Sequence, residues 1–487
     1  MPVTITNSLL FPSAFGIVSN AYYVATYGSD SNSGTLVAPF LTLSKAQTAM
    51  QASLTNKTTY VRAGTYSITS GITLTSTDNG ETISYYPPDG YNSAILDRGI
   101  NAMTTFAANW VFTINGGSNI TINGLTIQNF GAWAIGIHGG AADNTGGGSA
   151  FPATGVVSNV TIINNIIKNG YTDNSTTNAN SGWSGGGIYA SGSTTNLQIL
   201  NNVVINQYSN GIRAVPTDAG GGYPNPGGNQ NGLTISNNVV LVTNQAIGDG
   251  GAIYVQDLNF NSTNITISNN FVRDYQSTSA LRNSTSPTRD VAIYLDEGAC
   301  NVTVTGNIIA ATSNALASPG PSLASTQAFY SSSGHNNTWF NNIVDLGTAA
   351  VILNLDYELF SGGGAPTMSG NSIYSNIFIG KWSGAQASYA SGNGPNAYIN
   401  GGASVYPTNT YNMYYNYGSG SLSTTSTSNN FNDASPVTGT NPLISGTIYT
   451  LASNSPAFNS PVNFSPIVGG WGPPGYTIPT GTAPCYS

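Results

Sequence analysis

Two neighbouring carboxylates, Asp296 and Glu297, end the apolar run of the stretch DVAIYLDEGACNVTVTGNII at residues 290–309. Only 6% of the chain is charged, so acidic side chains that gather in one region stand out. Two more acids, Asp249 and Asp257, bracket the similar run DGGAIYVQD. Glycosidic cleavage normally needs two carboxyls, because one protonates the leaving oxygen while the other attacks or activates water. Whether these four acids can meet depends on the elements that carry them.

Internal repetition is the strongest signal in the chain. One template, Asn-apolar-Thr-apolar-x-Asn-Asn-apolar-apolar, recurs every 32 to 37 residues, and in the first copy Gly124 takes the place of the second Asn of the pair. That second Asn falls at Asn165, Asn202, Asn238, Asn270, Asn307, Asn342 and Asn376. Each copy alternates β-branched and polar residues, which indicates a strand, and a second short strand follows at a variable distance.

The copies contain no helical stretch between strands, which disfavours a doubly wound α/β fold. The pattern predicts an all-β fold, a right-handed, single-stranded parallel β-helix in which every turn stacks on the previous one and shares its core. Long loops rich in Gly, Ser, Pro and Asn would project from its side. The repeated Asn would tolerate left-handed turns, and its amides would bond along a ladder with a spacing of about 4.8 Å.

The second strands predict a stripe on the outer face of the coil. We align them on the apolar residues Ile137, Ile188, Ile212, Ile253, Ile293, Phe329 and Ile352. If these point inward, the next residues point outward, namely His138, Tyr189, Arg213, Tyr254, Tyr294 and Tyr330. This stripe has two interpretations. It is a groove whose rings stack on sugars, or it is a solvent-exposed tyrosine ladder that stabilises the strands.

Asp296 lies two residues beyond Tyr294 and therefore on the same face. We predict Asp296 as one catalytic carboxyl, with Asp249 or Asp257 of the preceding turn as its partner. Glu297 is the alternative partner, although it would face a turn. Candidates for binding substrate anions are Arg282, Arg289 and His335. No sequence-spaced metal motif is visible, and no cofactor is predicted; a lyase would instead need Ca²⁺ or cationic groups beside a uronate.

The chain resembles the pectate-lyase-like superfamily of right-handed β-helix proteins. YYVATYGSDSNSGTLVAPFLTLSKAQTAM at 22–50 is similar to the family's opening strand and short capping helix, TYVRAGTYSIT to its first turn, and NPLISGTIYTLASNSPAFN to its closing segment. The acidic strands are similar to those of glycoside-hydrolase-type β-helix proteins, but His335 replaces an expected Arg, which leaves the substrate's charge open. Phage tailspikes share this fold.

The resemblance implies a division of the chain into regions. These are an N-terminal attachment segment at 1–20, a cap with the first turns at 21–115, the main coil at 116–380, irregular late turns at 381–440 and a closing segment with its tail at 441–487. It also implies a homotrimer with the C-terminal tail in the interface. Residues 1–20 would contact other tail proteins of a virion.

The composition of the chain excludes some classes of binding partner. A net charge of −8 with few Lys and Arg argues against nucleic acid, and no apolar run is long enough to span a bilayer. Cys300 and Cys485 are too few for a disulfide framework and are expected to be plain thiols. The sequence therefore predicts a virion-tail or extracellular protein that binds polysaccharide. Three functions remain possible from the sequence, namely a glycoside hydrolase, a polysaccharide lyase and a non-catalytic adhesion fibre.

Overall fold

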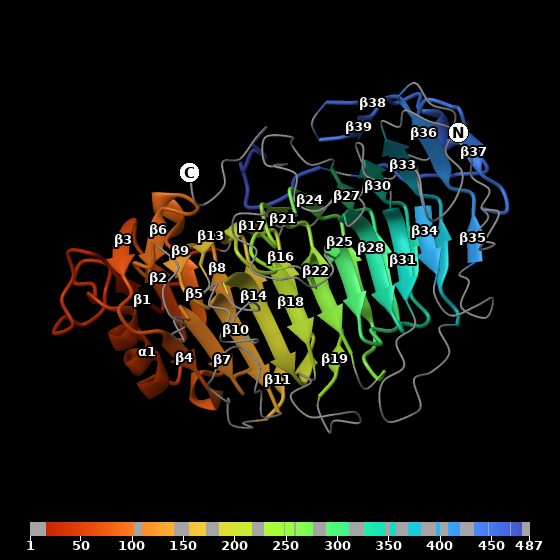
Figure 1. The fold of residues 1–487 in the computed structure, drawn as a ribbon. Helices are drawn as coiled ribbons and strands as arrows, with labels where there is room; N and C mark the ends of the chain where they lie inside the picture. Colours follow the sequence, from red (N-terminus) through yellow and green to blue (C-terminus); the bar gives the residue numbers. More distant parts are fainter. Residues whose placement is uncertain are drawn as a thin grey trace.

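The computed structural model shows the chain as a parallel β-solenoid whose wall consists of three long sheets (Figure 1). It describes residues 16–101, 110–140, 155–171, 185–216, 228–247, 249–257, 260–275, 289–310, 326–345, 351–356, 369–380, 396–399, 408–418, 433–446, 448–467 and 469–479. The side chains of a few strand residues in these ranges, Asp249, Arg289 and Asp356 among them, are not described. The predicted all-β solenoid is confirmed.

Apart from the first strand and the last three strands of these sheets, each turn of the solenoid contributes one strand to each sheet in the same order. Sheet 1 contains β1 (Ala21–Val24), β2 (Thr58–Val61), β5 (Thr82–Tyr85), β8 (Thr121–Asn123), β12 (Thr161–Ile163), β16 (Gln198–Leu200), β20 (Thr234–Ser236), β23 (Ile265–Ser268), β26 (Val302–Thr305), β29 (Thr338–Phe340), β32 (Ser372–Tyr374) and β35 (Thr408–Thr410). Sheet 2 contains β3 (Gly64–Ser67), β6 (Ala94–Asp97), β9 (Thr126–Phe130), β13 (Ile166–Gly170), β17 (Val203–Gln207), β21 (Val239–Leu241), β24 (Phe271–Arg273), β27 (Ile308–Ile309), β30 (Ile343–Asp345), β33 (Ile377–Gly380), β36 (Met413–Asn416) and β37 (Val437–Thr438).

Sheet 3 carries the predicted stripe. It contains β4 (Ile72–Leu74), β7 (Phe112–Asn115), β10 (Trp133–Gly139), β14 (Gly186–Gly192), β18 (Ile212–Val215), β22 (Asp249–Gln256), β25 (Arg289–Asp296), β28 (Thr326–Ser332), β31 (Val351–Asp356) and β34 (Asn396–Ile399). A small sheet joins β11 (Val157–Ser158), β15 (Thr194–Thr195) and β19 (Gln230–Asn231), and β38 (Ile444–Ser445) pairs antiparallel with β39 (Thr450–Leu451). Strands β34 to β37 continue the long sheets through the region predicted to be irregular.

Alternation along the short strands produces the core. In sheet 1, Thr121, Thr161 and Gln198 occupy one outward column, whereas the next residues, among them Ile162 and Ile199, are fully buried inside. Because identical positions stack strand upon strand, the inward residues of all three sheets merge into one continuous apolar core.

The asparagine pairs divide two tasks between them. The first Asn of a pair adopts a left-handed conformation at the turn, for example Asn164 with φ 59° and Asn201 with φ 54°. The second Asn is completely buried, and its backbone N–H and side-chain Nδ2 both donate to the Oδ1 of the second Asn one turn later, at 2.8 to 3.1 Å. The predicted ladder runs from Asn165 to Asn412.

The first copy of the template needs a correction. Thr121 pairs with Thr161 and Asn123 with Ile163, so Gly124 aligns with Asn164, the first Asn of the pair. Gly124 supplies the left-handed turn with φ 71°. Leu125 stands at the position of the second Asn, and its N–H donates to Oδ1 of Asn165 at 3.0 Å, which starts the ladder.

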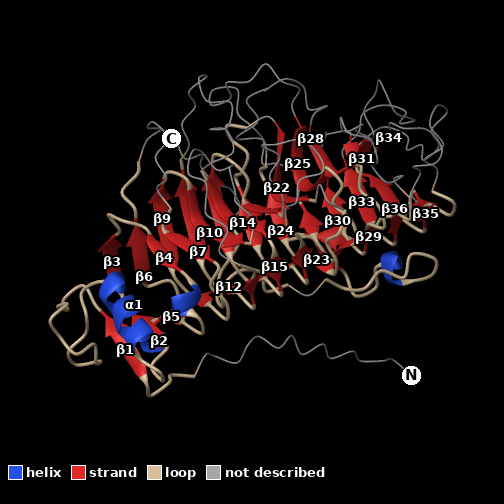
Figure 2. Ribbon diagram, turned by 90° about the horizontal axis from the view of Figure 1, so that it is seen from below, coloured by secondary structure: helices blue, strands red, loops and turns tan. Residues whose placement is uncertain are grey.

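The predicted capping helix is present. Helix α1 (Leu43–Ala52) lies across the first turns at one end of the solenoid (Figure 2). Thr42 caps its N-terminus by accepting from the Lys45 N–H at 3.1 Å, and its buried face includes Leu43 and Met50. The helix therefore closes an end of the core that would otherwise expose apolar side chains.

The C-terminal segment returns along the outside of sheet 2. Phe464 and Trp471 pack over the outward apolar column of that sheet, and the rings of Trp471 and Phe271 lie 5.7 Å apart. Arg273 donates from Nη2 to the Pro479 carbonyl at 2.8 Å. Residues 469–479, expected in a trimer interface, thus cover the chain's own sheet, while 480–487 lie outside the described residues. Over the part of the chain that is described, no helix is long and apolar enough to cross a membrane.

Candidate active site

Register aligns two columns of residues along the outer face of sheet 3. The aromatic column runs strand by strand through Gly136, Tyr189, Arg213, Tyr254, Tyr294, Tyr330 and Asn354. Two residues further along, the acid column contains His138, Ser191, Val215, Gln256, Asp296, Ser332 and Asp356. We call the two columns together the stripe.

The register corrects the predicted alignment at both ends. Ile188 pairs with Ile135, not Ile137, so His138 stands in the acid column beside Ser191. At the other end Phe329 pairs with Leu353, not Ile352. A shift of two residues keeps a side chain on its face, but a shift of one residue reverses it.

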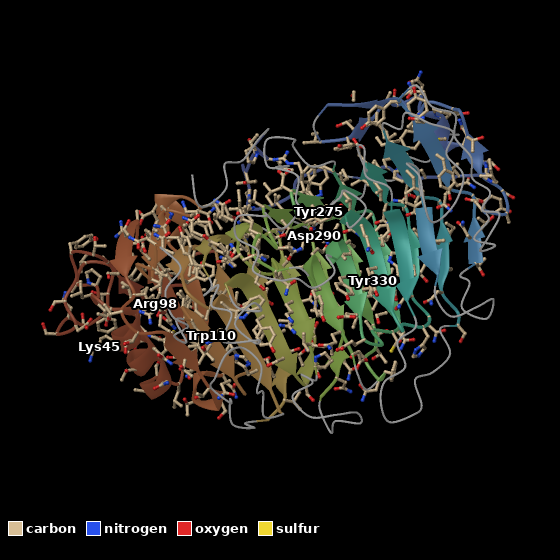
Figure 3. The ribbon with its side chains drawn as sticks, in the orientation of Figure 1. Lys45, Arg98, Trp110, Tyr275, Asp290 and Tyr330 are labelled. Carbon is tan, nitrogen blue, oxygen red and sulfur yellow. The ribbon has the colours of Figure 1, made fainter. Side chains whose placement is uncertain are left out.

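The rings of the stripe are buried, so neither interpretation agrees with the structure: they form no solvent-exposed tyrosine ladder, and they offer no open face on which a sugar could stack. Tyr189, Tyr254, Tyr294 and Tyr330 are all at most 2% exposed and form an apolar cluster with Trp110 and Trp133, separate from the core. In Figure 3, Trp110 and Tyr330 lie toward opposite ends of this cluster. Asp296, at 7%, is more exposed than any ring in it, and Glu297 is half-buried. Partial solvent access thus begins at Glu297, directly after β25.

The rings form a packed row. Trp133 stacks on Tyr189 at 5.1 Å, and Tyr294 makes edge contacts with Tyr254 at 5.0 Å and Tyr330 at 4.6 Å. The Arg213 guanidinium lies over Tyr189 at 5.6 Å and over Tyr254 at 5.1 Å. Such cation–π contacts hold a buried cation among apolar surfaces.

Asp296 is held at both carboxylate oxygens. The Tyr254 hydroxyl donates to Oδ2 at 2.5 Å, and the Glu297 N–H donates to Oδ1 at 2.8 Å. Burial, with the charges of Asp296 and Glu297, raises the pKa of Tyr254 well above its usual 10.0, although Arg213 opposes this rise. Tyr254 is thus a phenol that donates to Asp296. Two donors, one at each oxygen, suit a carboxylate at this position.

Asp249 is not the partner of Asp296. Its backbone pairs with Arg289 at the start of β22 and β25, whereas Asp296 pairs with Gln256 at their ends. Seven residues of strand separate the two positions, about 23 Å at roughly 3.3 Å per residue. Stacking brings together equivalent positions of neighbouring turns, and these two are not equivalent.

Asp257 is fully buried and secures a turn. Its Oδ2 accepts from the N–H groups of Asn261 at 3.0 Å and Ser262 at 2.7 Å, and the Cys300 thiol lies 3.8 Å away. Burial, then the Asp257 charge, raises the pKa of Cys300 to about 12, so this thiol is not a nucleophile. These contacts assign Asp257 a structural role.

Among the residues that the structure describes, the predicted substrate-binding histidines and arginines do not all gather around Asp296. The Nδ1 of His138 lies 2.7 Å from the Ser191 hydroxyl, within the stripe. His335 is half-buried beside the ring of Phe260, and burial lowers its pKa below the usual 6.5 although the Asp257 charge opposes this. Arg289 begins β25, far from Asp296 along the strand, while Arg282 lies outside the described residues.

Asp356 is the residue that the sequence analysis missed. It pairs with Ser332, which follows Ser331 opposite Leu295, so it stands in the acid column two strands from Asp296. At about 4.8 Å per strand, the two backbone positions lie about 9.6 Å apart. The signal was present in the sequence, since VILNLD at 351–356 aligns without a gap on VAIYLD at 291–296.

A further acid lies at the opposite end of β25. Asp290 is buried beside Tyr275, as Figure 3 shows. Burial first, then the charge of Asp290, raises the pKa of Tyr275. Among the described residues no group of three or more His, Cys, Asp or Glu side chains is arranged to hold a metal ion.

Comparisons with known proteins identify the fold. No protein-family model matches the chain, and no curated protein is detectably similar in sequence. Among solved structures it is similar to a lacto-N-biosidase of glycoside hydrolase family 136 from Eubacterium ramulus, with a TM-score of 0.50 and 12% identity over 86% of this chain and 67% of the other. The pectate lyase Pel9A has a TM-score of 0.49 and 12% identity over 90% of both chains. An alginate lyase from Paenibacillus has a TM-score of 0.45 and 14% identity over 74% of this chain and 97% of the other. The similarity to the lacto-N-biosidase, at 12% identity, shows a shared fold, the predicted parallel β-helix.

Proposed function

We propose that the protein binds and degrades a polysaccharide, as a glycoside hydrolase whose reaction takes place at the outer face of sheet 3. The parallel β-helix shared with a lacto-N-biosidase supports this proposal. The observation that carries it is the carboxylate of Asp296, held by Tyr254 and by the N–H of the half-buried Glu297. A fixed carboxylate suits the hydroxyls of a sugar, because its oxygens accept their hydrogen bonds.

Asp296 acts as the general base in this proposal. It takes a proton from a water molecule while the water oxygen bonds to the anomeric carbon, and the glycosidic C–O bond breaks as an acid delivers its proton to the leaving oxygen. A carboxylate that already accepts two hydrogen bonds has lone pairs left for the water.

Asp356 is the proposed acid. Inverting glycosidases keep their carboxyls about 6.5–9.5 Å apart to leave room for the water, whereas retaining ones need about 5–5.5 Å. The backbone positions of Asp296 and Asp356, two strands apart, are separated by about 9.6 Å, which is closer to the carboxyl separation of inverting enzymes than to that of retaining ones. Glu297, directly next to Asp296 in sequence, is the competing acid.

Chain shortening tests the proposal. The protein is incubated with a panel of bacterial capsular and exopolysaccharides, and product size is followed by size-exclusion chromatography. We expect wild type and Asp97→Asn to shorten one polymer, because Asp97 lies on sheet 2 and bonds Gln128 and Asn129. Asp296→Asn should leave that polymer intact. Full activity of Asp296→Asn would show that Asp296 is not the general base.

A polysaccharide lyase is the second candidate, favoured by one observation. Arg213 is a buried cation within the stripe, and β-elimination needs a cationic group to neutralise a uronate carboxylate. Cleavage by a lyase leaves an unsaturated uronate that absorbs ultraviolet light, and hydrolysis does not. Product absorbance therefore separates the two reactions. If neither kind of product forms, the remaining function is that of a non-catalytic, glycan-binding fibre.

The narrower expectations on assembly are also proposals. We propose a homotrimeric, extracellular or virion-tail protein, a phage tailspike, whose residues 1–20 contact other tail proteins. The low charge and the Asn-, Ser-, Thr- and Gly-rich composition are compatible with such a setting. Sedimentation equilibrium measures the mass directly, and a mass of 50.2 kDa would exclude the trimer.

A further inference from the structure

Two buried polar atoms flank Asp296 in the acid column. Gln256 pairs with Asp296 on one side, and Ser332 occupies the neighbouring position on the other side, each about 4.8 Å away along the sheet. Gln256 is 3% exposed and Ser332 is fully buried. Among the residues that the structure describes, neither Oε1 of Gln256 nor Oγ of Ser332 has a hydrogen-bond partner.

An unpartnered buried polar atom costs stability. Most such atoms in native proteins are hydrogen-bonded, because a buried atom without a partner loses the bonds that it made with water in the unfolded chain. Asp296, by contrast, has a donor at each oxygen, from the Tyr254 hydroxyl and the Glu297 N–H. Two orphaned atoms, one on each side of the proposed base, are therefore unexplained by the packing of the protein and fit groups that a ligand completes.

The chemistry of these atoms selects the ligand. The amide oxygen of Gln256 accepts a hydrogen bond, and the hydroxyl of Ser332 accepts or donates. A uronate carboxylate placed between them would face the charge of Asp296 and that of the adjacent Glu297, and like charges at this range repel. A neutral sugar ring supplies hydroxyl donors to the same atoms without that repulsion.

We propose that Gln256 and Ser332 form a hydroxyl-binding subsite around Asp296, which selects a neutral sugar unit over a uronate at the point of cleavage. This inference rests on the proposed glycan-degrading function and names its substrate class. The two residues are positioning residues, since they hold the sugar against the base and transfer no proton themselves.

The test combines stability with binding. Gln256→Met and Ser332→Ala remove the orphaned atoms and keep most of the side-chain volume. Gln128→Met is the matched control, because Nε2 of Gln128 donates to Oδ2 of Asp97 at 2.6 Å on sheet 2. Melting temperatures are measured without ligand. Dissociation constants come from retardation at 4 °C in native gels that contain either a neutral or a uronate-rich exopolysaccharide.

The subsite predicts opposite effects on the two readouts. Gln256→Met and Ser332→Ala should keep the melting temperature or raise it by about 1–2 °C, and weaken binding of the neutral polymer about tenfold. Gln128→Met should lower the melting temperature and leave binding unchanged. If trapped water satisfies the two atoms, both variants will melt earlier with binding intact, and the subsite is then wrong.

Charge selection and catalysis are separable in the same experiment. Tighter retardation by the uronate-rich polymer than by any neutral one would overturn the inference even if chains are shortened. Conversely, the protein could bind a neutral polymer selectively through Gln256 and Ser332 without shortening it. That result would support the proposed subsite and contradict the proposed hydrolase activity. Retardation by neither polymer would overturn the subsite.

Discussion

The hydroxyl of Tyr254 and the carboxylate of Asp296 meet at 2.5 Å although 42 residues separate them along the chain. The two side chains do not occupy the same column, because Tyr254 lies beside Tyr294 and Asp296 beside Gln256. The phenol therefore crosses diagonally to the next strand, a reach that long aromatic side chains have. This diagonal contact fixes the proposed base and is the first target for mutation.

Tyr254→Phe should reduce kcat/KM about 10- to 100-fold. A hydrogen bond to a charged group contributes about 1.5–3 kcal/mol, and about 1.4 kcal/mol corresponds to a factor of ten. The matched control is Tyr66→Phe, whose hydroxyl donates to the Val24 carbonyl at 3.1 Å and the Arg62 carbonyl at 2.9 Å near the cap. The control should lower the melting temperature and keep activity. Equal activity of wild type and Tyr254→Phe would show that the diagonal contact is structural.

Asp356→Asn and Glu297→Gln distinguish the two candidate acids. Loss of a general acid typically costs a factor of about 10² to 10⁴ in rate. We expect that loss for Asp356→Asn, with Glu297→Gln within a factor of about ten of wild type, measured as reducing ends released per minute. The reverse pattern would assign the acid to Glu297 and make the register argument for Asp356 wrong.

The asparagine ladder should dominate the stability of the solenoid. Asn270 donates from its N–H and Nδ2 to Asn307 and from Nδ2 to the Ile235 carbonyl, and it accepts twice from Asn238. Asn270→Ala leaves buried donors and acceptors unmade, so it should lower the free energy of unfolding by about 2–4 kcal/mol.

Asn159→Gly is the control for this ladder. Asn159 is an exposed turn residue with φ 55° that bonds Asn119 and Asn196 through its side chain. Glycine keeps the left-handed turn, so the free energy of unfolding should change by less than about 1 kcal/mol. Urea denaturation monitored by circular dichroism compares the two variants. Equal losses would mean that burial adds nothing to these amide bonds.

Glu81 should make stability fall as pH rises. It is fully buried near Asp78, and burial, followed by the Asp78 charge, raises the pKa of Glu81 to about 8 from 4.5. The folded state therefore keeps a proton that the unfolded chain loses. The free energy of unfolding should decrease between pH 4.5 and 8 and level off above pH 8.

Glu81→Gln is the variant that isolates this effect. Asp78 accepts from Gln47 and Gln51 of α1, so ionisation of Glu81 disturbs the carboxylate that fastens the cap. Melting temperatures at pH 5, 6, 7 and 8.5 should show a smaller decline for Glu81→Gln than for wild type. If the melting temperature of Glu81→Gln declines with pH as much as that of wild type, a group other than Glu81 loses the proton.

The template repeats allowed much of the fold to be predicted. Period-two alternation around residues such as Ile162 and the recurring asparagines require stacked parallel strands, because each turn alone leaves its apolar side exposed. The similarity of residues 22–50 to the opening segment of the pectate-lyase-like proteins indicated the capping helix. These features are local and repeated, so the chain itself records them.

The candidate site could be predicted only in part. Asp296 and the tyrosines were placed on the correct face, since alternation decides the face of a residue. Asp249 was paired with the wrong end of β25 and Asp356 was overlooked, since turns of unequal length hide which residues stack. Burial of the stripe was also not evident from the pattern, because an outward position in a strand carries no mark of what packs over it.

The sequence by itself thus determined that this chain coils into stacked strands, with buried asparagines at the turns and a row of tyrosines outside the core. Only the tertiary structure decided which acids share a column and that Tyr254 donates to Asp296. The physical reason is register: hydrogen bonds between strands fix it to the residue, and a change of one residue moves a side chain to the other face.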